Sequence, residues 1–235
     1  YNTIFRPDSI VLPDTKFRHF RFEIFSEKTR KFRRLKDIIE SKEQLWQRIA
    51  QIVPKNAYFT PTKWLNPIYV GKTKKELNVM LSSTLYFDID FGLLKPPTFM
   101  QAKKNTQELI NLVYAKYSRD PDLVVFSGKQ GFHVYYWDWN SRSIINLHPA
   151  DRIKQFTVER KEVLRELSIH GIVVDSQITL DPYRIMKIPN TLHGGTGLIA
   201  KPVKDLISFD PPVDALAFER KYYGSIIKVD LTKIY

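Results

Sequence analysis

Asp88 and Asp90 stand two residues apart inside an apolar run, LYFDIDF at 85–91. Successive side chains of a strand point to opposite faces, so both carboxylates would share one face, about 7 Å apart. Like charges placed in this way repel each other, and burial disfavours the charged form of each. A divalent cation such as Mg²⁺ or Mn²⁺ resolves this conflict, because it prefers oxygen ligands. The alternative for an isolated Asp-x-Asp is a solvated strand end.

A second candidate is the segment SGKQGFH at 127–133, which lies between two apolar runs. Gly128 and its neighbours leave backbone amides open, and Ser127, Lys129 and His133 add side chains that could hold a triphosphate. The spacing is not that of a Walker A loop, since GxxxxGK[ST] is absent. The alternative is a hairpin with a partly buried histidine.

A third candidate begins at Asp175, which ends the short apolar run IVVD at 172–175. Lys187 and His193 follow in a long irregular segment whose glycines let the backbone approach a ligand. Taken alone, His193 would be a turn histidine with a local hydrogen bond. The ordered set of an Asp-x-Asp strand, a hairpin turn, a third aspartate and this loop favours one ligand-binding site.

The elements that must position these residues mix helices and strands without strict alternation. Two capping boxes, at Ser41–Gln44 and Thr98–Gln101, predict helices over 41–53 and 98–117. A third helix is expected over 150–169, with Gly171 as its left-handed cap. Period-two patterns and β-forming residues predict five strands, at 20–24, 84–91, 122–127, 133–138 and 172–175. We therefore expect an α+β fold, with a mixed or antiparallel sheet flanked by helices.

The charge balance points to a polyanionic partner. Lys and Arg number 37 against 25 Asp and Glu, which gives a formal net charge of +12. The excess is concentrated between Lys16 and Lys36, where nine Lys and Arg face only Glu23 and Glu27. We expect this strand pair to bind nucleic acid, the alternative being a solvated face. The residues expected to make the contacts are Arg30, Lys31, Arg33 and Arg34.

Composition excludes several classes of protein. The chain has no cysteine, so disulfides, cysteine-bound zinc, iron–sulfur clusters and a cysteine nucleophile are ruled out. No apolar run approaches the roughly 20 residues that span a membrane, and an intracellular protein is expected. With 43% hydrophobic residues the chain can build a core. We expect one domain over 1–235, with 204–235 as a possible packing or docking element at its C-terminal end.

The ordered motifs, from Leu85 to Leu198, resemble the catalytic small subunit of archaeo-eukaryotic primases. The most specific match is the run PNTLHGGTGL at 189–198 together with the lysine before it. The family's three acidic metal ligands correspond to Asp88, Asp90 and Asp175, and its Ser-to-His nucleotide motif to Ser127 and His133. Asp175 and His193 are 18 residues apart, as in the family.

Two departures set this chain apart from the family's usual pattern. The Cys/His zinc knuckle that normally follows the first acidic motif is missing, and only 36 residues separate Asp90 from Ser127. Lys129 and Gln130 stand where the family often has arginine. These features are typical of a compact or diverged version of the family, for example one from a mobile element.

The resemblance implies a prim-pol fold and a template-directed nucleotidyltransferase that makes primers on single-stranded DNA from nucleoside triphosphates. Asp88, Asp90 and Asp175 would hold two Mg²⁺ or Mn²⁺ ions. Nucleotide binding would fall to Ser127, Gly128, Lys129, His133, Lys187 and His193. A primase large subunit would be a partner, and the location would be the cytoplasm, with the nucleoid, in an archaeal, bacterial or mobile-element setting. The alternatives are a non-priming polymerase of the same superfamily and a non-catalytic single-strand-binding module.

Overall fold

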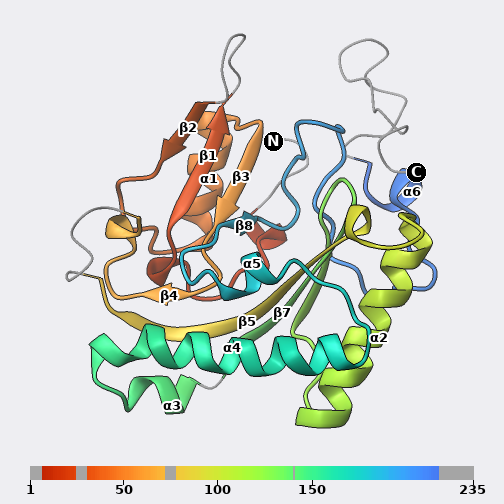
Figure 1. Cartoon of the computed structure of the whole chain (residues 1–235). Coiled ribbons are helices and arrows are strands. Elements are labelled where there is room, and N and C mark those ends of the chain that lie inside the picture. The colour runs from red at the N-terminus through yellow and green to blue at the C-terminus, as the bar shows by residue number, and fades with distance from the viewer. Residues whose placement is uncertain (1–6, 25–30, 72–77, 140, 217–235) are drawn as a thin grey trace, which may run out of the picture.

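The computed structural model describes residues 7–24, 31–71, 78–139 and 141–216, which contain two four-stranded sheets (Figure 1). The first sheet has the order β2-β1-β3-β8, with β1 Phe20–Ile24, β2 Lys31–Arg34, β3 Asn56–Phe59 and β8 Met186–Lys187. The second has the order β4-β5-β7-β6, with β4 Lys63–Trp64, β5 Met80–Asp90, β6 Leu123–Phe126 and β7 Gly131–Trp139. All of these pairings are antiparallel.

Helices cover the sheets and enclose their cores. Helix α1 (Lys42–Ile52) packs Leu45 and Ile49 against Phe22 of β1 in one hydrophobic cluster. Helices α2 (Phe99–Tyr117) and α4 (Arg152–Ile169) pack against the second sheet, and Figure 1 shows α4 running along β5. The shorter helices are α3 Ser141–Ile145, α5 Ser176–Leu180 and α6 Pro211–Asp214, and 3-10 turns occupy 7–9, 15–17, 67–69, 91–93 and 149–151. The predicted α+β fold is confirmed.

Local capping explains where the predicted helices begin and end. Ser41 Oγ and Thr98 Oγ1 each accept a hydrogen bond from the amide three residues later, at 3.2 Å in both cases. After α4 the chain turns at Gly171, whose φ of +70° suits a residue without a side chain. These helix ends follow the sequence prediction.

The predicted strand at 172–175 is wrong. These residues join no described strand, and Asp175 instead caps α5, with its Oδ1 accepting from the amides of Gln177 and Ile178 at 3.0 and 3.2 Å. The backbone amide of Asp175 donates to the carbonyl of Asp88 at 2.9 Å. The aspartate carboxylate thus accepts hydrogen bonds from free helix amides and caps a helix that begins directly after the predicted strand.

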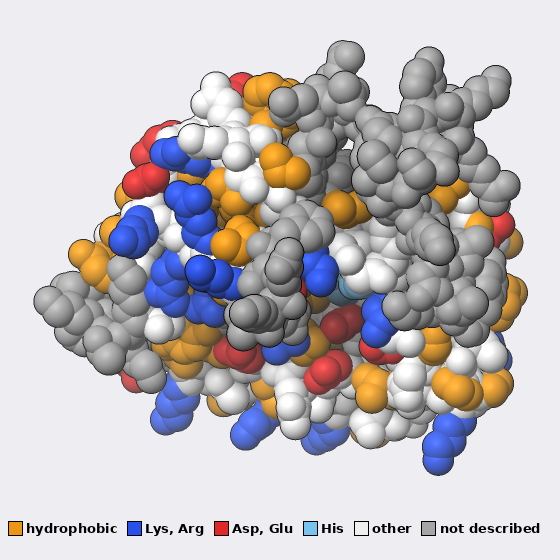
Figure 2. All heavy atoms as spheres, turned by 90° about the horizontal axis from the view of Figure 1, so that it is seen from above, with side chains coloured by type: hydrophobic (Ala, Val, Ile, Leu, Met, Phe, Trp, Pro, Cys, Tyr) orange, Lys and Arg blue, Asp and Glu red, His pale blue; other side chains and the backbone are white. Residues whose placement is uncertain are grey.

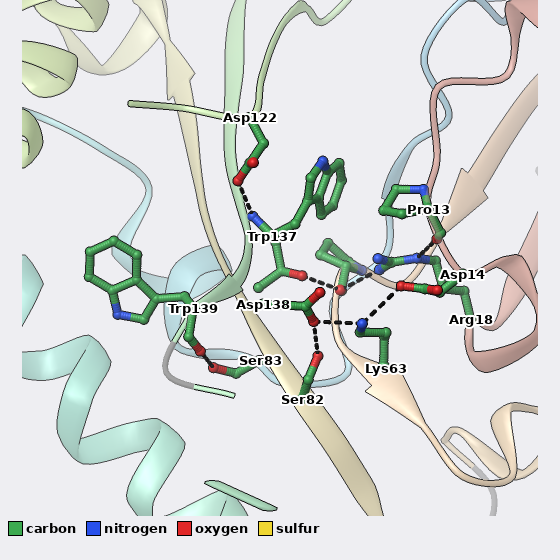
Figure 3. A network of polar contacts seen from close by, with 12 residues as sticks. Pro13, Asp14, Arg18, Lys63, Ser82, Ser83, Asp122, Trp137, Asp138 and Trp139 are labelled. Carbon is green, nitrogen blue, oxygen red and sulfur yellow. Dashed lines mark hydrogen bonds and ion pairs between the residues drawn. The ribbon is translucent and has the colours of Figure 1, made fainter. Parts of the chain in front are cut away.

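A buried polar joint connects the two sheets (Figure 3). The fully buried Arg18 lies between the rings of Phe59 in β3 and Trp137 in β7, 5.6 and 5.0 Å from their centroids. Beside it, Lys63 forms ion pairs with Asp14 and Asp138. The joint thus links β3 of the first sheet to β7 of the second.

The C-terminal element expected at 204–235 is described only as far as residue 216. Leu216 forms an isolated bridge with Leu198. The other apolar residues expected to belong to this element, from Phe218 onward, lie outside the described residues. Within the described ranges, no helix is both long and apolar enough to cross a membrane.

Candidate active site

A pocket of about 190 Å³ lies between the two sheets, and residues from both line it. Figure 2 shows acidic side chains and a histidine in a hollow that has Lys and Arg side chains at its margin. The structure brings together seven of the predicted site residues as lining: Asp88, Asp90, Ser127, Lys129, His133, Lys187 and His193. Two others, Asp175 and Gly128, lie directly behind this lining.

The surroundings of Asp88 disfavour the charged form of its carboxylate. It is only 22% exposed and has no hydrogen-bond partner among the described residues. Burial, with Asp90 and Asp175 nearby, raises the pKa of Asp88 from 3.8 to about 7, while Arg184 acts in the opposite direction. A cation placed at this carboxylate would therefore be bound favourably.

Asp90 and Asp175 are each anchored by one oxygen and keep the other available. Asp90 Oδ1 accepts from the amide of Gly92 at 2.8 Å, and Asp175 Oδ1 caps α5 as described above. Neither Oδ2 has a hydrogen-bond partner in the described parts of the chain. Three aspartates at one place are the oxygen donors that Mg²⁺ and Mn²⁺ prefer, so the residue types fit such a site.

The carboxylates do not yet converge on one point. Within the described ranges, no group of three or more His, Asp or Glu side chains is arranged to hold a metal ion. Backbone amides hold only one carboxylate oxygen of Asp90 and of Asp175. Binding of a metal ion would therefore require these side chains to rotate.

His133 faces Asp88 from the neighbouring strand. Asp88 in β5 and His133 in β7 are cross-strand partners, and His133 Nε2 lies 3.6 Å from Asp88 Oδ1, too far for a hydrogen bond. The hydroxyl of Tyr135 lies 3.3 Å from His133 Nδ1. Burial, with Lys187 and Arg184 nearby, lowers the pKa of His133 to about 3. His133 is therefore neutral at physiological pH and acts as a hydrogen-bonding group rather than a cation.

The backbone of the hairpin turn at 127–131 lies in close contact with the backbone of β5. A Cβ at Gly131 would stand 1.6 Å from the carbonyl oxygen of Ile89, so only glycine fits there. At Gly128, where φ is +88°, a Cβ would lie 2.7 Å from that of His193. These two glycines let the turn at 127–131 contact both the acidic strand and the loop that carries His193.

On the basic side, Asn56 connects the predicted phosphate-binding residues to a buried carboxylate. Lys187 is only 4% exposed, and its Nζ donates to Asn56 Oδ1, which also accepts from the amide of Gly194 at 3.1 Å. Asn56 Nδ2 donates to Glu23 Oε2 at 2.8 Å, and the hydroxyl of Tyr58 lies 3.4 Å from the same oxygen. Lys187 is thus held in place before any ligand arrives.

Thr196 holds His193 against the hairpin turn. Thr196 Oγ1 donates to the carbonyl of Gly128 at 2.6 Å and lies 3.2 Å from His193 Nδ1. His193 Nε2 has no partner among the described residues. Burial, with Lys187 and Lys129 nearby, lowers the pKa of His193 to about 3. A neutral imidazole with one engaged nitrogen is left to offer the other to a ligand.

Sequence reasoning missed several residues of this pocket. Arg184, an exposed cation at the lining, makes no side-chain hydrogen bond or ion pair with the described residues, although only three positions separate it from Lys187. Tyr58 also lines the pocket. Glu23, counted among the charges of the segment from Lys16 to Lys36, is only 5% exposed. Nothing in the sequence around Asn56 or Glu23 indicates that the two side chains meet.

The register of the first sheet places the predicted nucleic-acid-binding residues on two opposite faces. Arg34 pairs with Arg21, on the face that carries Tyr58 and Lys187. Arg33 pairs with Phe22 and Lys31 with Ile24, so both point to the opposite face. Arg30 lies outside the described residues.

Known proteins similar to this chain are primase subunits. The chain is 25% identical to the DNA primase small subunit of Pyrobaculum calidifontis, over 79% of this chain and 75% of the relative. It is 26% identical to that of Archaeoglobus fulgidus, over 71% of this chain and 67% of the relative. No family model matches the chain.

A solved structure supports the fold alone. The polymerase domain of Mycobacterium tuberculosis ligase D, in complex with DNA, superposes with a TM-score of 0.50 at 18% identity, covering 88% of this chain and 69% of that one. The resemblance that the ordered motifs predict is therefore confirmed: the chain is a sequence relative of the DNA primase small subunits and has an α+β fold of the prim-pol type.

Proposed function

We propose that this chain is a nucleotidyltransferase that makes primers on single-stranded DNA from nucleoside triphosphates with the help of divalent metal ions. The observation that carries the proposal is the meeting of two kinds of group across one pocket. On β5, the carboxylates of Asp88 and Asp90 line the pocket, and cations and glycine-containing turns lie opposite them. A nucleotide with its metal ions would neutralise both groups of side chains, because the metal ions bind the carboxylates and the phosphates bind the cations.

Asp88, Asp90 and Asp175 would hold Mg²⁺ or Mn²⁺. When bound, two such ions activate an attacking oxygen and neutralise charge at a phosphoryl group. The chain itself supplies the alignment: β5 fixes Asp88 and Asp90 on one face, and the α5 cap holds Asp175 beside Asp88. No protein nucleophile is needed, because the attacking hydroxyl belongs to the nucleic acid.

The triphosphate would be held by the opposite wall and the turn. Lys187, oriented by Asn56, and the exposed Arg184 supply positive charge, and Lys129 adds a third cation. The Ser127 hydroxyl and His193 Nε2 supply hydrogen bonds. Because His193 is neutral, its contact is a hydrogen bond of ordinary strength rather than an ion pair.

The primase relatives suggest three further features of this chain. These are action in DNA priming, a template of single-stranded DNA, and a large-subunit partner. The single catalytic domain over 1–235 is a separate proposal, made from the sequence alone. The likeness to the ligase D polymerase domain favours a second candidate, a polymerase that extends existing ends but does not start strands.

A circular single-stranded template tests the proposal. The chain is incubated with this template, nucleotides and Mg²⁺ or Mn²⁺, with and without a primer, using ribonucleotides and deoxyribonucleotides in turn. The proposal predicts product without a primer from the unaltered chain and none from Asp88→Asn, whose fold is verified by circular dichroism. Product only with a primer would assign the second candidate. Strand binding without any product, or an active Asp88→Asn protein, would contradict the proposed chemistry.

A further inference from the structure

A row of side chains runs from the pocket across the first sheet. In register, Arg34 pairs with Arg21, Arg21 with Tyr58, and Tyr58 with Lys187, so the four share one face. Neighbouring strands are about 4.8 Å apart, which places Arg21 about 10 Å and Arg34 about 14 Å from Lys187 along the row. Since Tyr58 and Lys187 line the pocket, the row continues the proposed phosphate-binding wall outward.

The guanidinium groups of both arginines lie close to the backbone of Gly71. A Cβ at Gly71 would stand 3.1 Å from Arg21 Nη2 and 3.3 Å from Arg34 Nη2. Gly71 has a φ of +69°, which disfavours a side chain there, so no side chain of residue 71 separates the two guanidinium groups. The buried His19 orients Arg21, because Arg21 Nε donates a hydrogen bond to His19 Nε2 at 3.2 Å.

The carboxylates of the described residues leave the positive charge of this pair uncompensated. Neither Arg21 nor Arg34 forms an ion pair with any carboxylate among the described residues. Glu23 shares their face, but Asn56 and Tyr58 engage its carboxylate. Burial, with Arg21 beside it, lowers the pKa of Arg34. Like charges on directly opposed strand positions are destabilising, and a bound anion would remove that cost.

An exposed aromatic residue lies on the same face. Phe32 pairs with Glu23 in register, is 44% exposed, and has its ring centroid 6.1 Å from that of Tyr58. Cationic side chains that follow a phosphate backbone, next to an aromatic ring on which a base can stack, are the usual means of holding single-stranded nucleic acid. At about 10 and 14 Å along the row from Lys187, this pair stands apart from the proposed triphosphate contacts.

We propose that Arg21 and Arg34 form a second phosphate site, which binds a backbone phosphodiester of a single nucleic-acid strand while Phe32 stacks on one of its bases. The proposal rests on the proposed function only for the role of that strand in copying. The binding itself is independent of catalysis.

The test compares strand binding with nucleotide binding in the double variant R21A/R34A. Fluorescence anisotropy with a labelled oligothymidylate of about 20 nucleotides, over a series of salt concentrations, reports the first. Loss of two phosphate contacts should lower the log–log salt slope by about 1.4 and weaken binding about tenfold or more. Phe32→Ala should weaken binding at least about fivefold without changing the slope. Isothermal titration with a nucleoside triphosphate should give wild-type affinity for both variants.

A charge-matched control is R142A/R165A, which removes two exposed arginines from α3 and α4. It should keep the wild-type slope. R21K/R34K retains both charges and should do so too, so a loss of slope there, in a protein that unfolds at the wild-type temperature, would overturn the phosphate assignment. An unchanged slope in R21A/R34A, or lost nucleotide affinity with intact strand affinity, would also overturn it.

The outcome is separable from that of the proposed function. Asp88→Asn tests catalysis and should leave the salt slope intact. If the unprimed and primed assays both fail while R21A/R34A flattens the slope, the second phosphate site stands and the proposed chemistry falls.

Discussion

The two walls of the pocket solve the problem of buried charge in opposite ways. On β5, the carboxylate of Asp88 is enclosed without a hydrogen-bond partner among the described residues, and burial raises its pKa to about 7. On β8, Lys187 is even less exposed, but its ammonium group donates to Asn56, which in turn donates to Glu23. The carboxylate of Asp88 thus lacks a protein partner among the described residues, whereas the protein itself supplies the partner of Lys187.

This difference predicts different consequences of mutation. Removing the charge of Asp88, on the acidic wall formed by the β5 carboxylates, should raise the free energy of unfolding and abolish nucleotide addition. Removing a brace from the basic wall should destabilise the protein and weaken substrate binding while leaving the chemistry intact.

The largest effect is expected at Asp88. Asp88→Asn keeps the shape of the side chain and removes the charge that would hold a metal ion, so the rate of nucleotide addition should fall by about 10³-fold or more. Single-turnover extension of a primed template measures the chemical step directly. A loss confined to the nucleotide KM would contradict the assignment of Asp88 to the acidic wall.

The same aspartate predicts a pH-dependent stability of the metal-free protein. Between pH 3.8 and about 7 the folded state keeps a proton that the unfolded state has lost, so the free energy of unfolding falls as pH rises through this window. The total fall from this group is up to about 4 kcal/mol at 1.36 kcal/mol per pKa unit. Urea unfolding in EDTA from pH 4 to 8 should show it, and Asp88→Asn should lack it. An identical pH profile in both proteins would contradict the raised pKa.

Loss of Asn56, which orients Lys187, should have the opposite effect on stability. Asn56→Ala leaves Glu23 and Lys187 buried without their shared partner, which should lower the free energy of unfolding by about 1–3 kcal/mol. The nucleotide KM should rise about tenfold with kcat nearly unchanged, because Lys187 is no longer oriented. A variant with wild-type KM and lowered stability would limit Asn56 to a structural role.

His193 should have a smaller effect than a charged contact. A protonated histidine would give roughly a 10- to 150-fold loss of nucleotide affinity on removal. Because burial lowers the pKa of His193 to about 3, the neutral form is present and His193→Ala should cost only about 2- to 10-fold. That loss should be constant between pH 6 and 9, and affinity for single-stranded DNA should stay unchanged. Loss of DNA affinity with intact nucleotide affinity would contradict the division of the walls.

The smallest effect is expected at Lys31 and Arg33. Both were predicted to bind nucleic acid, but the register turns them away from the face of Arg34. Replacing both by alanine should change oligothymidylate affinity by no more than about twofold, measured in the anisotropy assay above. A loss as large as that of R21A/R34A would show that the edge strand binds through both faces.

Local chemistry was predictable from the sequence, and long-range partners were not. The caps at Ser41 and Thr98 depend on residues three positions apart, and the helices begin where they were expected. The ordered motifs located the pocket because each lies at a strand end or turn. Asp175 misled the prediction, since IVVD has strand-forming residues and nothing in it shows that the carboxylate will cap a helix.

Two other features depend on pairing across the sheet. Whether Arg33 or Arg34 faces the pocket is decided by the register with β1, which the sequence of β2 does not contain. Glu23 alternates correctly for an exposed position and is buried because Asn56 and Tyr58, more than 30 residues away, provide hydrogen bonds. Such partners become visible only when the strands are assembled.

The small size of the pocket bears on copying accuracy. At about 190 Å³ it is below the roughly 300 Å³ at which sites begin to enclose a drug-sized ligand, and its lining is suited to phosphates and metal ions. If the proposed function holds, the described residues grip the part that every nucleotide has in common and leave the base outside. The choice among the four bases would then rest on pairing with the template strand, so errors should follow the stability of mispairs rather than the side chains of this pocket.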